Sequence, residues 1–113
     1  MSSHIKTRPL PGKYVVRAAG AVLGETTSAV ELTEGSYPPV IYIPRADVAM
    51  AFLETSATTS RCPHKGDASY FTIQAKSGPI ADAAWSYETP APGLEAIAGH
   101  LAFYADKVAV EQL

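Results

Sequence analysis

The chain has 113 residues, of which 47% are hydrophobic and 18% charged, and its formal net charge is −2. This length gives one domain with one core, and without a basic stripe we expect no nucleic-acid partner. One cysteine excludes an internal disulfide framework and a four-cysteine zinc site, and it points to the reducing cytosol. No apolar run approaches the roughly 20 residues of a membrane span, so we expect no membrane partner.

The N-terminal half is predicted to be mostly strand. Residues 1–12 are expected to be a flexible leader that ends at a Pro-Gly turn, and residues 13–113 to form the domain. β-Branched and aromatic residues, or apolar–polar alternation, predict four strands in this half. They cover residues 13–18, 21–27, 29–35 and 40–43, with a bend or bulge at Gly20.

One helix is expected next, over residues 45–54. Pro44 ends the preceding strand and suits a helix start. Val48, Ala51 and Phe52 then follow the spacing of an apolar helical stripe, and residues 55–59 break it.

The C-terminal half is again predicted to be strands. A turn at residues 76–79 joins strands over 69–75 and 80–87. After a loop and one helical turn over residues 94–97, a C-terminal hairpin is expected over residues 100–111. Seven or eight strands with one or two short helices indicate a mainly β fold, either a small twisted antiparallel barrel or a folded sheet.

The densest chemistry lies in residues 60–70, with the sequence SRCPHKGDASY. Lys65 and its neighbours favour a thiolate at Cys62, which would make Cys62 a nucleophile or redox thiol, or else a buried strand-end residue. His64 either orients that thiol or is a solvated turn residue. Lys65 and the backbone N–H of Gly66 suit an anion, although Gly66 also fits a turn that needs a positive φ.

Two charged candidates lie elsewhere. Arg45, at the end of a strand, either holds an anion or forms an ion pair with Glu88 or Asp67. Glu88 is also the best candidate for an acid–base carboxylate. His64, His100 and Cys62 are metal-ligand types, but their spacing is not diagnostic and we predict no metal site.

An aromatic set is expected either to line a ligand pocket or to pack in the core. Its members are Tyr42, Tyr70, Trp85, Tyr87 and Tyr104.

Four blocks in order resemble the domain of unknown function 427 family, which is sometimes labelled nucleotidyltransferase-like. They are YPPVIYIPR (37–45), TSRCPHKGDASY (59–70), AWSYE (84–88) and GHLAFY (99–104), and the resemblance covers residues 13 to 111. It implies a small, single-domain, β-rich cytosolic protein and supplies no function. In the family an aromatic residue usually occupies the position of His64. The matching positions are Arg45, Cys62, Pro63, Lys65, Gly66, Tyr70, Trp85, Tyr87, Glu88 and Tyr104. The paired carboxylates and phosphate loop of nucleotidyl transfer are not recognisable in the sequence.

Two functions therefore compete. In the first, the domain binds a small anionic or polar metabolite and has an enzymatic activity if Cys62 or Glu88 supplies one. Arg45 and Lys65 hold the ligand there and aromatic rings enclose it, while the sequence leaves any cofactor unknown. In the second, the domain is a non-catalytic interaction module or a homodimeric adaptor that uses its aromatic face.

Overall fold

The structure, a computed structural model, describes residues 4–113. Within this range, ten strands account for most of the chain: β1 (Ile5–Pro9), β2 (Tyr14–Ala18), β3 (Ala21–Thr26), β4 (Val30–Glu34), β5 (Val40–Tyr42), β6 (Leu53–Cys62), β7 (Gly66–Ala75), β8 (Gly78–Ser86), β9 (Ala102–Phe103) and β10 (Ala109–Gln112). The helical content of the same range is three single turns of 3-10 helix: η1 (Arg45–Asp47), η2 (Met50–Phe52) and η3 (Glu95–Ile97). None of the helices in this range is long and apolar enough to cross a membrane.

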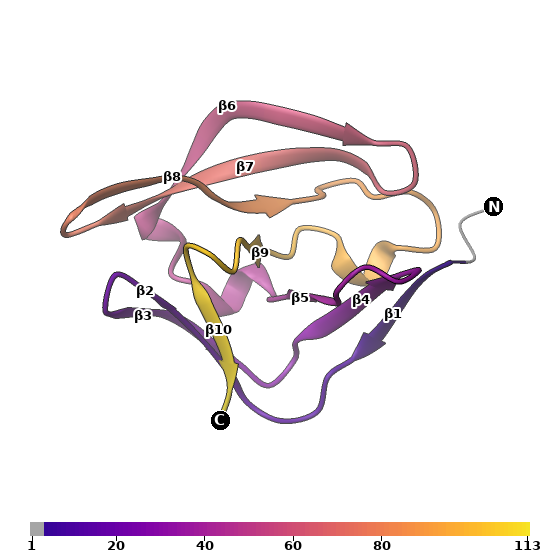
Figure 1. Cartoon of the computed structure of the whole chain (residues 1–113), viewed down its shortest axis with the longest axis horizontal. Helices are drawn as coiled ribbons and strands as arrows, with labels where there is room; N and C mark the ends of the chain where they lie inside the picture. Colours follow the sequence, from indigo (N-terminus) through magenta and orange to yellow (C-terminus); the bar gives the residue numbers. More distant parts are fainter. Residues whose placement is uncertain (1–3) are drawn as a thin grey trace.

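The strands form three antiparallel sheets with the orders β1-β4-β5, β10-β2-β3 and β6-β7-β8-β9. Figure 1 shows the long strands β6 to β8 across the top and the two smaller sheets below, with β9 of the long sheet and β5 of one smaller sheet at mid-height. A bridge between Ile43 and Leu101 connects β5 to β9, and a bridge between Gly24 and Val48 connects β3 to the segment after η1. The predicted mainly β fold is confirmed, in its folded-sheet form, because each sheet keeps two edge strands and none closes into a barrel.

The β2–β3 hairpin explains the predicted bend at Gly20. Ala19 and Gly20 have φ values of 49° and 80°. Two successive positive φ values are typical of the two-residue turn whose twist matches that of paired strands. The chain therefore reverses at Gly20.

The predicted flexible leader is wrong over its described part. β1 pairs with β4 in a continuous register from Ile5 opposite Glu34 to Pro9 opposite Val30. Ile5 is buried, which anchors the strand to the core. The remaining residues of the predicted leader, 1–3, lie outside the described part of the chain.

The predicted helix over residues 45–54 is also wrong. Val48 is extended, and the Ala49 N–H donates to the carbonyl of Leu23 over 2.7 Å. This pairing with β3 interrupts the helical stripe between η1 and η2, because tertiary contacts override a weak local propensity. Residues 55–59, predicted to be a break, lie inside β6.

The predicted C-terminal hairpin is wrong in its pairing. β9 pairs with β8, whereas β10 pairs with β2 in a different sheet. The turn between them is closed by the N–H groups of Lys107 and Val108, which both donate to the carbonyl of Tyr104.

The core has two clusters of buried apolar residues. The larger one, with Val16, Ile73 and Leu101, lies between the β10-β2-β3 sheet and the long sheet. The smaller one contains Tyr42 and Tyr87, and Trp85 packs against it. The aromatic residues singled out in the sequence thus gather at the smaller cluster.

Candidate ligand-binding pocket

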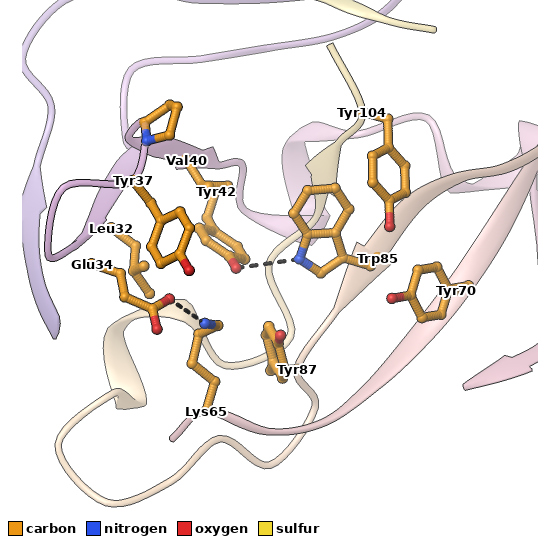
Figure 2. Close-up of a pocket in the computed structure, with 11 residues that line it drawn as sticks. Leu32, Glu34, Tyr37, Val40, Tyr42, Lys65, Tyr70, Trp85, Tyr87 and Tyr104 are labelled. Atoms are coloured by element: carbon orange, nitrogen blue, oxygen red, sulfur yellow. Dashed lines mark hydrogen bonds and ion pairs between the residues drawn. The ribbon is translucent and has the colours of Figure 1, made fainter. Parts of the chain in front are cut away.

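A pocket of about 240 Å³ opens beside the smaller core cluster. Strands β4, β5, β7 and β8, the loop before β5, the turn before β7 and the turn after β9 contribute to its walls (Figure 2). Its lining consists of Leu32, Glu34, Tyr37, Pro38, Val40, Tyr42, Lys65, Tyr70, Trp85, Tyr87 and Tyr104.

Tyr42 and Trp85 form one side of this pocket. Alternation along β5 places Tyr42 on the same face as Val40, and Tyr42 is only 1% exposed. The indole N–H of Trp85 donates to the Tyr42 hydroxyl over 3.3 Å, with the two rings nearly perpendicular. Tyr104 packs against the indole with its ring centre 4.7 Å away. The Trp85 ring is therefore held from two sides.

The buried Tyr42 hydroxyl is a neutral hydrogen-bonding group. Burial raises its pKa to about 12, and the hydrogen bond from Trp85 only partly opposes this. A phenol that accepts one hydrogen bond still has its own proton to donate. In Figure 2 this hydroxyl and that of Tyr37 point toward the side of the pocket formed by Glu34 and Lys65.

The polar wall is the Glu34–Lys65 ion pair. The Lys65 ammonium donates to Glu34 Oε1 over 2.6 Å, and the two side chains are only 14% and 20% exposed. The hydrogen bond from Lys65 holds the pKa of Glu34 below its usual range. Burial by itself would lower the pKa of Lys65, but hydrogen bonds to Glu34 and Cys62 outweigh it, so the pKa rises. Both groups are thus charged at neutral pH and compensate one another.

Tyr87 and Tyr104 are neutral as well. Burial is the main cause of a raised pKa at Tyr87, and it also raises the pKa of Tyr104 to about 12, with the neighbouring Tyr70 hydroxyl adding to the effect. The Tyr70 hydroxyl hydrogen-bonds with Ser60 Oγ over 2.8 Å. Tyr37 is 72% exposed and forms the rim. The pocket thus presents tyrosine hydroxyls around one compensated ion pair.

The structure separates the predicted site residues into two groups. Lys65, Tyr70, Trp85, Tyr87 and Tyr104 line the aromatic pocket, as does Tyr42 from the aromatic set. The other four predicted site residues do not line it: Arg45, Cys62, Gly66 and Glu88. Of these, three border a separate shallow hollow beside the loop 89–92: Cys62, Gly66 and Glu88.

Arg45 is engaged within the protein. Its Nε donates to the carbonyl of Gly99 over 3.0 Å, and its guanidinium forms an ion pair with Glu88. The guanidinium carbon also lies 5.4 Å from the centre of the Phe71 ring. Of the alternatives for Arg45, the ion pair with Glu88 is present, whereas Asp67 pairs with Arg61.

The turn at residues 62–66 has a structural basis. The Lys65 N–H donates to the carbonyl of Cys62, whose side chain is half-buried against the smaller core cluster. Gly66 has a φ of +114°, and a Cβ there would lie 3.3 Å from the carbonyl oxygen of Thr89. The glycine therefore fits both a positive φ and a close approach of the chain.

The candidate metal ligand His64 contacts another histidine. His64 packs edge-on against His4, with ring centres 4.9 Å apart. Within residues 4–113, no three side chains of the His, Cys, Asp or Glu type gather in a geometry that could hold a metal ion.

Sequence reasoning missed Glu34 and Tyr37. A signal existed for Glu34, because alternation along β4 places it on the same face as Leu32 and Val30. An acid that ends an apolar strand face needs a partner, and Lys65 supplies it. Tyr37 has no comparable signal, because its position depends on how the loop before β5 folds.

Comparison with known proteins gives a family. The model of the domain of unknown function (DUF427) matches residues 6–112, nearly the whole chain. A search of the curated proteins finds no match. The four sequence blocks that resemble this family are therefore part of a match along the full domain, and the chain belongs to the DUF427 family.

Proposed function

We propose that this domain binds a small, uncharged ring compound that carries hydrogen-bonding groups on its edge. The observation that carries the proposal is the charge-compensated Glu34–Lys65 pair set among aromatic side chains. Rings favour a ligand with a flat apolar face, and phenol hydroxyls favour edge groups that donate or accept hydrogen bonds.

Charge compensation favours a polar ligand over an anionic one. Lys65 is neutralised by Glu34, and Arg45 by Glu88. An anion would have to compete with a carboxylate for either cation, which costs desolvation and leaves that carboxylate unpaired. A cationic ligand would meet the Lys65 ammonium. An uncharged ligand adds hydrogen bonds to the pair without breaking it.

Binding is a better supported activity than catalysis. The candidate nucleophile Cys62 and the candidate base Glu88 lie outside the pocket, and Glu88 is paired with Arg45. The raised pKa values of Tyr42 and Tyr104 make both phenols poor bases at neutral pH. We place this binding activity in the reducing cytosol, in keeping with a free Cys62.

Isothermal titration calorimetry with a panel of three uncharged compounds tests the proposal. The compounds are methyl β-glucoside, adenosine and benzyl alcohol, and inorganic phosphate and choline serve as charged controls. We expect saturable binding of at least one uncharged compound and none of phosphate or choline. Tyr37→Ala should weaken binding, and Phe52→Ala, which removes an exposed aromatic ring outside the pocket, should not. Preference for phosphate, or failure of all three uncharged compounds, contradicts the proposal.

A second candidate function is an interaction module. Val22 and Phe52 are 48% and 52% exposed and border an apolar hollow of about 370 Å³ between the β2–β3 and β7–β8 turns. Exposed apolar patches of this kind favour protein contacts. If this hollow is a homodimer interface, wild-type protein sediments as a dimer and Phe52→Asp as a monomer. A monomeric wild-type protein at high concentration contradicts it.

A further inference from the structure

A second hollow adjoins the aromatic pocket. A groove of about 470 Å³ runs from it along β5 toward the C-terminal turn and β10. The pocket and the groove share five lining residues: Tyr37, Pro38, Val40, Trp85 and Tyr104. Because the same side chains border both, the two hollows adjoin.

The groove differs from the pocket in its chemistry. Beyond the shared residues its walls are formed by Pro39, Ile41, Phe103, Ala105, Val108 and Val110. None of the described residues that line it is charged, whereas the pocket contains the Glu34–Lys65 pair. The polar end of the combined site is therefore the pocket, and the apolar end is the groove.

We propose that the ligand is amphipathic, with a polar ring in the pocket and an aliphatic extension in the groove. This inference rests on the proposed function and adds the second half of the ligand. Two exposed aromatic residues, Tyr37 and Tyr104, lie where pocket and groove meet. Their partly exposed rings would be covered by an extension that leaves the pocket, which is a favourable burial of apolar surface.

Matched pairs of compounds test the aliphatic extension separately from the binding of the polar ring. Each pair compares a short compound with one that has the same polar ring and a longer alkyl chain. The pairs are methyl and hexyl β-glucoside, adenosine and N6-hexyladenosine, and benzyl alcohol and 4-pentylbenzyl alcohol. Each methylene that enters the groove should raise affinity by up to about fourfold. We therefore expect the extended member of a binding pair to bind at least tenfold more tightly.

Val110→Thr tests where the extension lies. Threonine has the shape of valine and suits a strand, so β10 should keep its pairing with β2. The variant should lose most of the gain from the extension while the short compound binds as before. Val22→Thr, the same change at an exposed position on β3, is the matched control and should keep the gain.

The outcomes are distinguishable. If a short compound binds and its extended partner binds no better, or if Val110→Thr leaves the gain intact, the amphipathic ligand is wrong and the proposed function stands. If no compound of any pair binds, the proposed function fails and the inference fails with it. If the ligand-free protein sediments as a dimer that Val110→Thr dissociates, a second copy covers the groove and the inference is overturned.

Discussion

The Trp85 indole donates a hydrogen bond to the Tyr42 hydroxyl over 3.3 Å and so joins β8 to β5 along one side of the pocket. These residues belong to different sheets and are 43 positions apart in the chain. The contact fixes the angle between two of the aromatic walls. It therefore holds two of the pocket's aromatic residues against one another.

Tyr42→Phe should lower the free energy of unfolding by about 1–2 kcal/mol. The substitution keeps the ring and leaves the indole N–H without its acceptor, which costs about that much. Urea unfolding followed by the fluorescence of Trp85, the single tryptophan, measures the change. Tyr14→Phe, at a buried tyrosine of the larger core cluster, is the control. Equal losses in both variants would mean that the Tyr42 hydroxyl contributes nothing specific.

Lys65→Met should destabilise the fold by about 1–3 kcal/mol, because it leaves a partly buried carboxylate without its charged partner. The double variant Glu34→Gln, Lys65→Met should recover part of that loss. Urea unfolding of the wild type, of each single variant and of the double variant gives four free energies of unfolding, and their differences give the coupling energy. Arg61→Met breaks an ion pair whose side chains are 76% and 73% exposed, so it should change stability by less than about 0.5 kcal/mol. A coupling energy near zero would show that Glu34 and Lys65 do not interact in solution.

Acid should remove the contribution of Glu34. Its pKa is lowered in the folded protein, mainly by Lys65, with His4 and His64 also nearby. The stabilisation is therefore present above the unfolded pKa of about 4.3 and is lost as the pH falls through the lower folded value. Wild-type protein should lose more stability than Glu34→Gln between about pH 5.5 and about pH 2.5.

The comparison with Glu34→Gln isolates this one group. Asp82 and Glu95 also have lowered pKa values, but both proteins retain them. Melting temperatures measured at matched ionic strength provide the test. Parallel curves for the two proteins would mean that the pKa of Glu34 is not lowered by folding.

Gly66→Ala should destabilise the domain more than Gly78→Ala. The two glycines have similar φ values of +114° and +121°, so alanine is strained at both, at a cost of about 1 kcal/mol or more. Only at Gly66 does the added Cβ meet a neighbour, the Thr89 carbonyl. Equal urea midpoints for the two variants would show that loop 89–91 yields without cost.

Arg45→Met should lower stability by about 1–2 kcal/mol and leave ligand affinity unchanged. Its guanidinium bonds to Gly99, Ser86 and Glu88 rather than to the pocket. Cys62→Ala should likewise keep affinity. Isothermal titration calorimetry with the tightest-binding compound of the panel measures the affinity of both variants. A tenfold loss of affinity in either folded variant would move the site to the hollow beside Cys62.

Alternation and turn chemistry predicted the β-rich fold and most strands, because both are local signals. The segment around Val48 and the strand Ile5–Pro9 could not be placed in this way. Each is decided by a partner far along the chain: Gly24 for Val48, and β4 for β1. Local helical spacing in residues 45–54 lost to that pairing.

The candidate site likewise has a part that local sequence signals predict and a part that depends on tertiary structure. The shared face of Trp85 and Tyr87 follows from strand alternation, so the aromatic half of the pocket was predictable. The closeness of Cys62, Lys65 and Gly66 in sequence was only partly informative. Lys65 does hydrogen-bond to Cys62, but a turn directs Lys65 into the pocket and leaves the other two residues outside it. The pairing of Lys65 with Glu34 spans 31 positions and depends on tertiary structure.

The indole N–H resonance of Trp85 tests the central claim most directly, because the chain has one tryptophan and its N–H bonds to Tyr42 at the pocket wall. The protein is titrated with the tightest-binding uncharged compound of the panel. We predict that this resonance and the backbone amides of Tyr42 and Lys65 shift together and saturate at one affinity. Saturating shifts at Cys62, Gly66 and Glu88 with an unmoved indole resonance would contradict the account and place the ligand outside the aromatic pocket.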